Sequence, residues 1–148
     1  MSISKINGET IIAAFGGGYS LRGTLASAAN NPSAGITYFG GGPLNTTITT
    51  TAGVRRLYIP KTGTIKSCYG YFNQNSSGSG NTGTLNIRLN NTTDTAVGTA
   101  AHNTTSTIYS NTSLSIAVTQ GDYIEFKWTC PATPPPTSIL SSFIIYIE

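Results

Sequence analysis

The sequence predicts an all-β fold, a sandwich of two antiparallel sheets, and favours a jelly roll over an immunoglobulin-like arrangement. Charged residues are only 9% of the 148 residues, whereas exposed helix faces normally carry many Glu, Lys and Arg. Thr, Tyr, Ile and Val, which favour strands, are frequent instead. About eight apolar segments, separated by turn signals roughly every 8 to 12 residues, are typical of a two-sheet sandwich.

The clearest strand–turn–strand pattern covers residues 114–128. Apolar residues occupy every second position on both sides of Gln120-Gly121-Asp122, which interrupts the alternation. Gly121 and Asp122 tolerate the backbone dihedrals of a turn, and we expect the Asp122 side chain to cap it. On the second strand, Ile124, Phe126 and Trp128 should share one face, with Tyr123, Glu125 and Lys127 on the other.

Further strands are expected at intervals along the chain. In the one at 64–72, alternation places Ile65, Tyr69 and Tyr71 on one side and Cys68 and Phe72 on the other. The last strand is apolar on both faces, so both faces should be covered. The segments that we expect to form these strands are residues 45–51, 54–59, 64–72, 85–89, 95–99, 104–109 and 139–147.

Residues 1–42 differ in amino-acid composition from the sandwich domain, which we assign to residues 43–148. They contain two Gly-Gly-Gly runs, and residues 21–29 could form a helical turn that Gly23 weakens. We interpret the segment as an extended N-terminal arm that becomes ordered against its own domain, sister subunits or a larger assembly; the alternative is a flexible tail. Its candidate docking residues are the apolar anchors Ile3, Ile6, Ile11, Ile12 and Phe15.

The residues that carry catalysis or bind metals are too few and too scattered to predict an enzyme. His102 is the only histidine, in a polar turn where a solvated side chain is the usual explanation. Asp122 and Glu125 are three residues apart on a turn and strand, so their side chains do not converge as glycosidase carboxylates must. We therefore expect no catalytic residue, no cofactor and no metal site.

Charge and hydropathy also exclude several partners. The net charge of +3 comes from eight Lys and Arg against five acidic residues, and only Arg55 and Arg56 are adjacent. A nucleic-acid surface needs a denser basic patch, so we expect no nucleic-acid binding. No apolar run is long enough to cross a bilayer, so we expect no membrane insertion. Cys68 and Cys130 permit one disulfide, although two buried thiols are the simpler interpretation.

Aromatic residues recur along the expected strands. They could line a sugar-binding groove, but packing in the core or across an oligomer interface is the commoner reason for such a pattern. The aromatic residues that could line a groove are Tyr38, Tyr58, Tyr69, Tyr71, Tyr109, Tyr123, Tyr146 and Trp128. The candidate core or trimer-interface residues are Tyr69, Tyr71, Trp128, Phe143, Ile145 and Tyr146.

Two stretches resemble known families. Residues 118–126 are similar to the late-strand turn of tumour necrosis factor-like and complement-type jelly rolls, and residues 143–147 resemble their closing strand. Residues 55–65 resemble the "strand, Pro-x-x-Gly-Thr, strand" opening of small bacteriophage and viral structural domains. The resemblance covers about residues 43–148 and leaves the arm out.

This resemblance implies a homotrimeric jelly roll on a virion, as a capsid decoration protein, head fibre or tail-fibre tip. Such a protein, assembled in the host cytoplasm, would bind and stabilise the particle and contact the host surface. The arm would then dock on the major capsid protein or the fibre shaft. The alternative is a carbohydrate-binding or adhesin module whose loop Tyr and Asn side chains hold host glycans.

Overall fold

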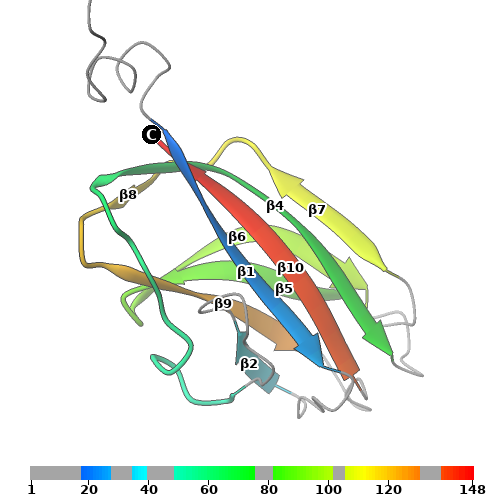
Figure 1. Ribbon diagram of the computed structural model, residues 1–148. Coiled ribbons are helices and arrows are strands. Elements are labelled where there is room, and N and C mark those ends of the chain that lie inside the picture. Colours follow the sequence, from blue (N-terminus) through cyan, green and yellow to red (C-terminus); the bar gives the residue numbers. More distant parts are fainter. Residues whose placement is uncertain (1–17, 28–34, 40–48, 76–81, 102–105, 131–137) are drawn as a thin grey trace, which may run out of the picture.

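The computed structural model describes residues 18–27, 35–39, 49–75, 82–101, 106–130 and 138–148 (Figure 1). These residues form two five-stranded antiparallel sheets, called sheet A and sheet B, and contain no helix. None of the described residues therefore forms a helix that is long and apolar enough to cross a membrane. The predicted all-β architecture of two antiparallel sheets is confirmed for this part of the chain.

Sheet A runs in the order β1-β10-β4-β7, and β8 also pairs with β4. Its strands are β1 (Tyr19–Ser27), β4 (Gly63–Asn75), β7 (Thr107–Asn111), β8 (Ile116–Val118) and β10 (Ser138–Ile147). Sheet B runs in the order β2-β9-β5-β6, and β3 also pairs with β9. Its strands are β2 (Gly35–Phe39), β3 (Leu57–Tyr58), β5 (Thr82–Leu89), β6 (Thr93–Ala101) and β9 (Tyr123–Cys130).

The core lies between the two sheets. Phe72 of sheet A lies 5.0 Å, centroid to centroid, from Trp128 of sheet B, and Phe126 stacks on Phe143 at 3.7 Å. Figure 1 shows the sheet A strands crossing in front of those of sheet B, as in a β-sandwich. The predicted alternation in β9 is confirmed, because Ile124, Phe126 and Trp128 share its buried face, and β5 and β10 likewise bury alternate apolar residues. These fully buried residues are Leu85, Ile87, Ile124, Phe126, Trp128, Ile145 and Ile147, with Phe143 nearly so.

The helical turn expected at residues 21–29 is wrong over Tyr19–Ser27, which forms β1 along the whole of β10. Gly23 is opposite Phe143, and the Phe143 ring fills the space that a side chain at position 23 would need. Both β1 and β2 (Gly35–Phe39) are thus ordered against the sheets of their own domain. The candidate docking residues Ile3, Ile6, Ile11, Ile12 and Phe15 lie outside the described residues.

The side-chain pattern predicted for residues 64–72 is wrong at Ile65. The β10 partner register passes from Tyr146↔Ser67 to Ile147↔Ile65, which leaves Lys66 as an extra residue on β4. Such a β-bulge shifts the alternation by one position. Ile65 and Cys68 therefore both point into the core, where each is completely buried.

Other expected strands are shorter or shifted. The strand predicted at 54–59 is reduced to the two-residue β3, and residues 49–53 form an isolated bridge, bends and a turn. The strand predicted at 104–109 is β7, with Ile108 outward and Tyr109 in the core. His102 and the Pro-rich segment 131–136 lie outside the described residues.

Candidate functional site

The outer face of sheet A carries an apolar surface made of Tyr69, Tyr71, Ile108, Ile144 and Tyr146, which we call the sheet A face. The strand register brings these residues together: Ile144 is opposite Tyr69, and Tyr71 is opposite Ile108. The Ile108 side chain is 85% exposed and Tyr69 is 46% exposed. The five side chains therefore form one patch on three adjacent strands and are not single scattered apolar residues.

A groove of about 520 Å³ crosses the sheet A face. It runs over a cross-strand row in which glycines alternate with inward-facing rings: Gly23, Phe143, Gly70 and Tyr109. The rings of Phe143 and Tyr109 occupy the core side of Gly23 and Gly70, so backbone alone forms the floor of the groove. The residues that line it are Arg22, Gly23, Tyr69, Gly70, Tyr71, Ile108, Ser142, Phe143 and Ile144.

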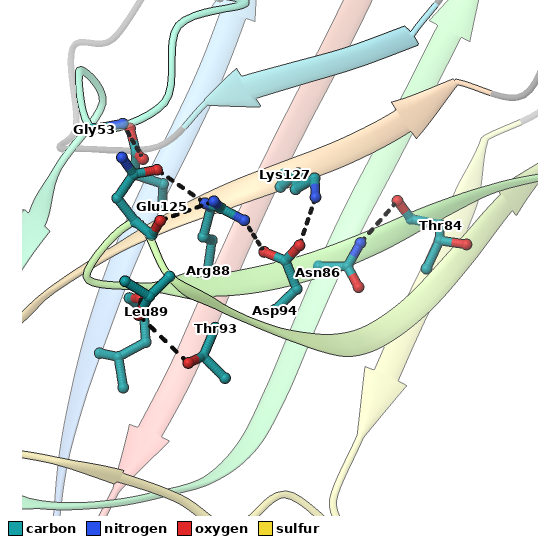
Figure 2. A network of polar contacts seen from close by, with 11 residues as sticks. Gly53, Thr84, Asn86, Arg88, Leu89, Thr93, Asp94, Glu125 and Lys127 are labelled. Carbon is teal, nitrogen blue, oxygen red and sulfur yellow. Dashed lines mark hydrogen bonds and ion pairs between the residues drawn. The ribbon is translucent and has the colours of Figure 1, made fainter.

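The outer face of sheet B is charged instead. Figure 2 shows Asp94 between Arg88 and Lys127, with a 2.8 Å ion pair from Asp94 Oδ1 to Arg88 Nη1. Burial opposes ionisation of Asp94, but the hydrogen bonds and charges of Lys127 and Arg88 outweigh it and lower the Asp94 pKa. The two outer faces therefore differ in kind: that of sheet B is charged, and that of sheet A is mainly apolar.

A second cluster of exposed groups surrounds Arg56, in the loop that leads into β3. Its guanidinium lies over the Tyr123 ring, with Cζ 4.4 Å from the ring centroid. Nε donates to the Gly53 carbonyl at 2.6 Å and Nη1 to the Tyr58 hydroxyl at 3.3 Å. The Tyr58 ring is 56% exposed and meets the Tyr123 ring edge-on at 6.0 Å. We call Arg56, Tyr58, Tyr123 and Asn91 the arginine–tyrosine cluster.

A buried carboxylate holds this loop in place. Glu125 is only 1% exposed, and its Oε2 and Oε1 accept the backbone N–H groups of Gly53 and Arg55, each at 2.6 Å. Figure 2 shows the Glu125 side chain directed at Gly53. Strand alternation predicted that the Glu125 side chain lies on the face of β9 opposite Ile124. The 53–55 loop covers it on that face.

The residues predicted from sequence fall into two groups. Trp128, Phe143 and Ile145 belong to the core, whereas Tyr69, Tyr71 and Tyr146 lie on the outward side of their strands. Sequence reasoning missed Ile108 and Ile144, which complete the sheet A face. The sequence does contain evidence for these two outward residues. Both β7 and β10 have apolar residues at consecutive positions, and one of two consecutive strand residues must face outward.

Gly121 and Asp122 lie in the turn between β8 and β9. Gly121 has φ +93°, a conformation that favours glycine. Asp122 Oδ2 accepts the Thr119 N–H at 2.7 Å, and Oδ1 accepts Asn90 Nδ2 at 2.8 Å. The hydrogen bonds from Asn90 and Thr119 lower the Asp122 pKa.

Within the described ranges, no three His, Cys, Asp or Glu side chains come together in a way that could hold a metal ion. Cys68 is a free thiol completely buried in the core, and burial raises its pKa to about 12. A thiol in that state is a poor nucleophile, because the thiolate is the reactive form. The Cys130 side chain lies outside the described set.

Comparison of this chain with family models, curated proteins and solved structures finds no match.

Proposed function

We propose that this protein is a virion structural protein, a trimeric jelly-roll capsid decoration or fibre protein that binds and stabilises the particle. The observation that carries the proposal is the sheet A face, an open apolar surface on a domain whose opposite outer face is charged. The sequence resemblance to trimeric jelly rolls and viral structural domains supplies the biological setting.

The strand order supports the jelly-roll part of the proposal. Strands β2 and β3 both pair with β9, and β7 and β8 both pair with β4. Counting each of these two pairs as one position reduces ten strands to eight. When these eight positions are numbered along the chain, sheet A has the order 1-8-3-6 and sheet B has the order 2-7-4-5. All but one of the successive connections cross between the sheets, which favours the double Greek key of a jelly roll.

A second copy of the chain is the partner that best fits the sheet A face. Protein interfaces are rich in aromatic side chains and poor in charge at their centre. The groove has that character: Tyr69, Tyr71 and the two isoleucines line it, and Arg22 is its one charged residue. The first described strand, β1, is the edge strand of sheet A, and residues 1–17 precede it in the chain. We propose that they carry the docking residues for the major capsid protein or fibre shaft.

The oligomeric state tests the proposal directly. Sedimentation equilibrium over a range of protein concentrations should give a trimer for the wild type. The substitution Ile108→Asp places a charge at the most exposed apolar position and should give monomers. The matched control Thr99→Asp adds the same charge to an exposed position on sheet B and should remain trimeric. A wild type that is monomeric at every concentration would overturn the trimer.

The virion assignment has its own test. Mass spectrometry of purified particles produced by the genome that encodes this chain should detect the protein at a fixed ratio to the major capsid or fibre protein. Deletion of residues 1–17 should leave the trimer intact and remove it from the particle. Recovery of the protein only in the particle-free fraction would contradict a structural role.

A second candidate function is a carbohydrate-binding module. The exposed Tyr58 ring beside the Arg56 guanidinium is the observation that favours it. The two functions are compatible, since a virion protein that contacts the host surface can bind host glycans.

A further inference from the structure

Three donor groups lie close together around Gly53, in the arginine–tyrosine cluster, and we call the space that they border the open point. A Cβ atom placed on Gly53 would have Arg56 Nη2 and the Tyr123 hydroxyl at 3.6 Å and Asn91 Nδ2 at 3.7 Å, with nothing outside its own neighbours nearer. Each of these distances is an ordinary van der Waals contact, and the φ of Gly53, +78°, favours glycine at this position. The donors come from three separate parts of the chain: the 53–56 loop, the turn after β5, and the start of β9.

The orientation of the Asn91 amide follows from its partner on the other side. Arg88 Nε donates to Asn91 Oδ1 at 3.1 Å, so the amide nitrogen, a donor, faces the open point. Arg88 Nη2 also donates to the Asn91 carbonyl at 2.8 Å. Asn90 and Asn91 have φ of 48° and 59°, and Asn90 Oδ1 accepts the Tyr123 N–H at 3.0 Å. These bonds fix the turn relative to β9.

The guanidinium of Arg56 is also held before any ligand arrives. Its bonds to the Gly53 carbonyl and the Tyr58 hydroxyl use Nε and Nη1, and the Tyr123 ring supports its plane. Nη2 is the guanidinium nitrogen nearest the open point. Because Glu125 fixes the loop backbone on both sides of residue 54, little ordering entropy remains to be lost when a ligand binds.

The chemistry of these groups defines the class of ligand. The open point is surrounded by donors, one of them cationic, which match an anionic oxygen better than a hydroxyl group that must also donate. The Tyr58 ring, 56% exposed, adds an apolar surface on which the C–H face of a sugar can stack. We propose that the arginine–tyrosine cluster binds an acidic saccharide, with its carboxylate or phosphate above Gly53 and its ring on Tyr58.

Isothermal titration calorimetry on the full chain tests this site. The probes are a uronic-acid trisaccharide, its neutral methyl ester, a sugar phosphate and inorganic phosphate. We expect saturable binding of the uronate or the sugar phosphate, and whichever binds tighter identifies the anionic group. The neutral ester and inorganic phosphate should bind at least about tenfold more weakly, because each lacks one half of the recognition.

Two substitutions assign the binding to the cluster. Arg56→Gln removes the cationic donor, and Asn91→Asp keeps an oxygen for Arg88 while replacing the amide donor with a carboxylate. Each should raise the Kd of the acidic probe about tenfold or more. The matched control Lys61→Gln removes an exposed positive charge at the turn before β4 and should leave the Kd unchanged. Near-ultraviolet circular dichroism establishes that each variant is folded.

Three results would overturn the proposal: no saturable binding of either acidic probe at millimolar concentration, equal binding of the uronate and its methyl ester, or an unchanged Kd in both folded variants. None of these results would bear on the trimer, because the cluster lies on sheet B and its loops, whereas the proposed interface is on sheet A.

Discussion

The Glu125 carboxylate holds Gly53 from 72 residues away in the sequence. The Gly53 N–H donates to Glu125 Oε2 at 2.6 Å, and the neighbouring Oε1 accepts the Arg55 N–H at the same distance. One buried side chain of β9 thus satisfies two backbone donors of a loop without regular structure. The arginine–tyrosine cluster depends on this contact, since Gly53 and Arg56 are in that loop.

The substitution Glu125→Gln should lower the free energy of unfolding by about 1–3 kcal/mol. The amide offers one acceptor where the carboxylate offers two, so one loop N–H faces another donor inside the protein. Urea denaturation monitored by fluorescence measures the change. Glu148→Gln is the matched control, because it makes the same chemical change at an exposed residue. Equal stabilities of the two variants would show that the Glu125 contacts contribute little.

The substitution Gly23→Ala should destabilise the domain by about 1–3 kcal/mol, since the new methyl group collides with the Phe143 ring. Phe143→Leu alone should also destabilise it, through the smaller side chain left in the core. The double variant should be more stable than the sum of the two changes predicts, because leucine vacates the space that the methyl group needs. A thermal-unfolding double-mutant cycle measures this coupling. Strict additivity would contradict direct contact between the two positions.

The sequence was most informative where strands are regular and half-buried. Alternation in β9 correctly placed Ile124, Phe126 and Trp128 on one face, because that face packs on the core. Alternation was misleading at Ile65, since a single extra residue at Lys66 reverses the alternation before it. The sequence around Lys66 does not indicate this β-bulge, and the register between β4 and β10 reveals it.

The remaining differences come from contacts between distant residues. Position 23 requires glycine because the Phe143 ring, 120 positions later, fills the space of a side chain there. Glu125 is buried by a loop that precedes it by 70 residues. No local propensity contains that information. The arginine–tyrosine cluster is similar: Arg56, Asn91 and Tyr123 are far apart in sequence, and only the folded sheet B brings their donors to one point.

The Cys68 thiol should resist modification in the native protein. Its pKa of about 12, raised by burial, leaves little thiolate at neutral pH, and the side chain is completely buried. A Cys130→Ser variant leaves Cys68 as the one thiol, and it should react with a maleimide reagent only at the rate of unfolding. Addition of urea should accelerate the reaction steeply. Rapid labelling of the native variant at neutral pH would contradict the buried position.

Acid should weaken the turn that Asp122 caps. Hydrogen bonds from Asn90 and the Thr119 backbone lower the pKa of Asp122 in the folded state, so its contribution is fully present above the unfolded value of about 4. As the pH falls through the lower folded pKa, both states become protonated and that contribution is lost. Asp122→Asn should therefore be less stable than the wild type at pH 7, with a difference that narrows as the pH falls below about 4. Urea midpoints measured at several pH values follow this difference, and Glu148→Gln provides the baseline for a carboxyl group at an exposed residue. A difference in stability between the Asp122→Asn variant and the wild type that stays constant down to pH 2 would show that the ionised carboxylate does not stabilise the turn.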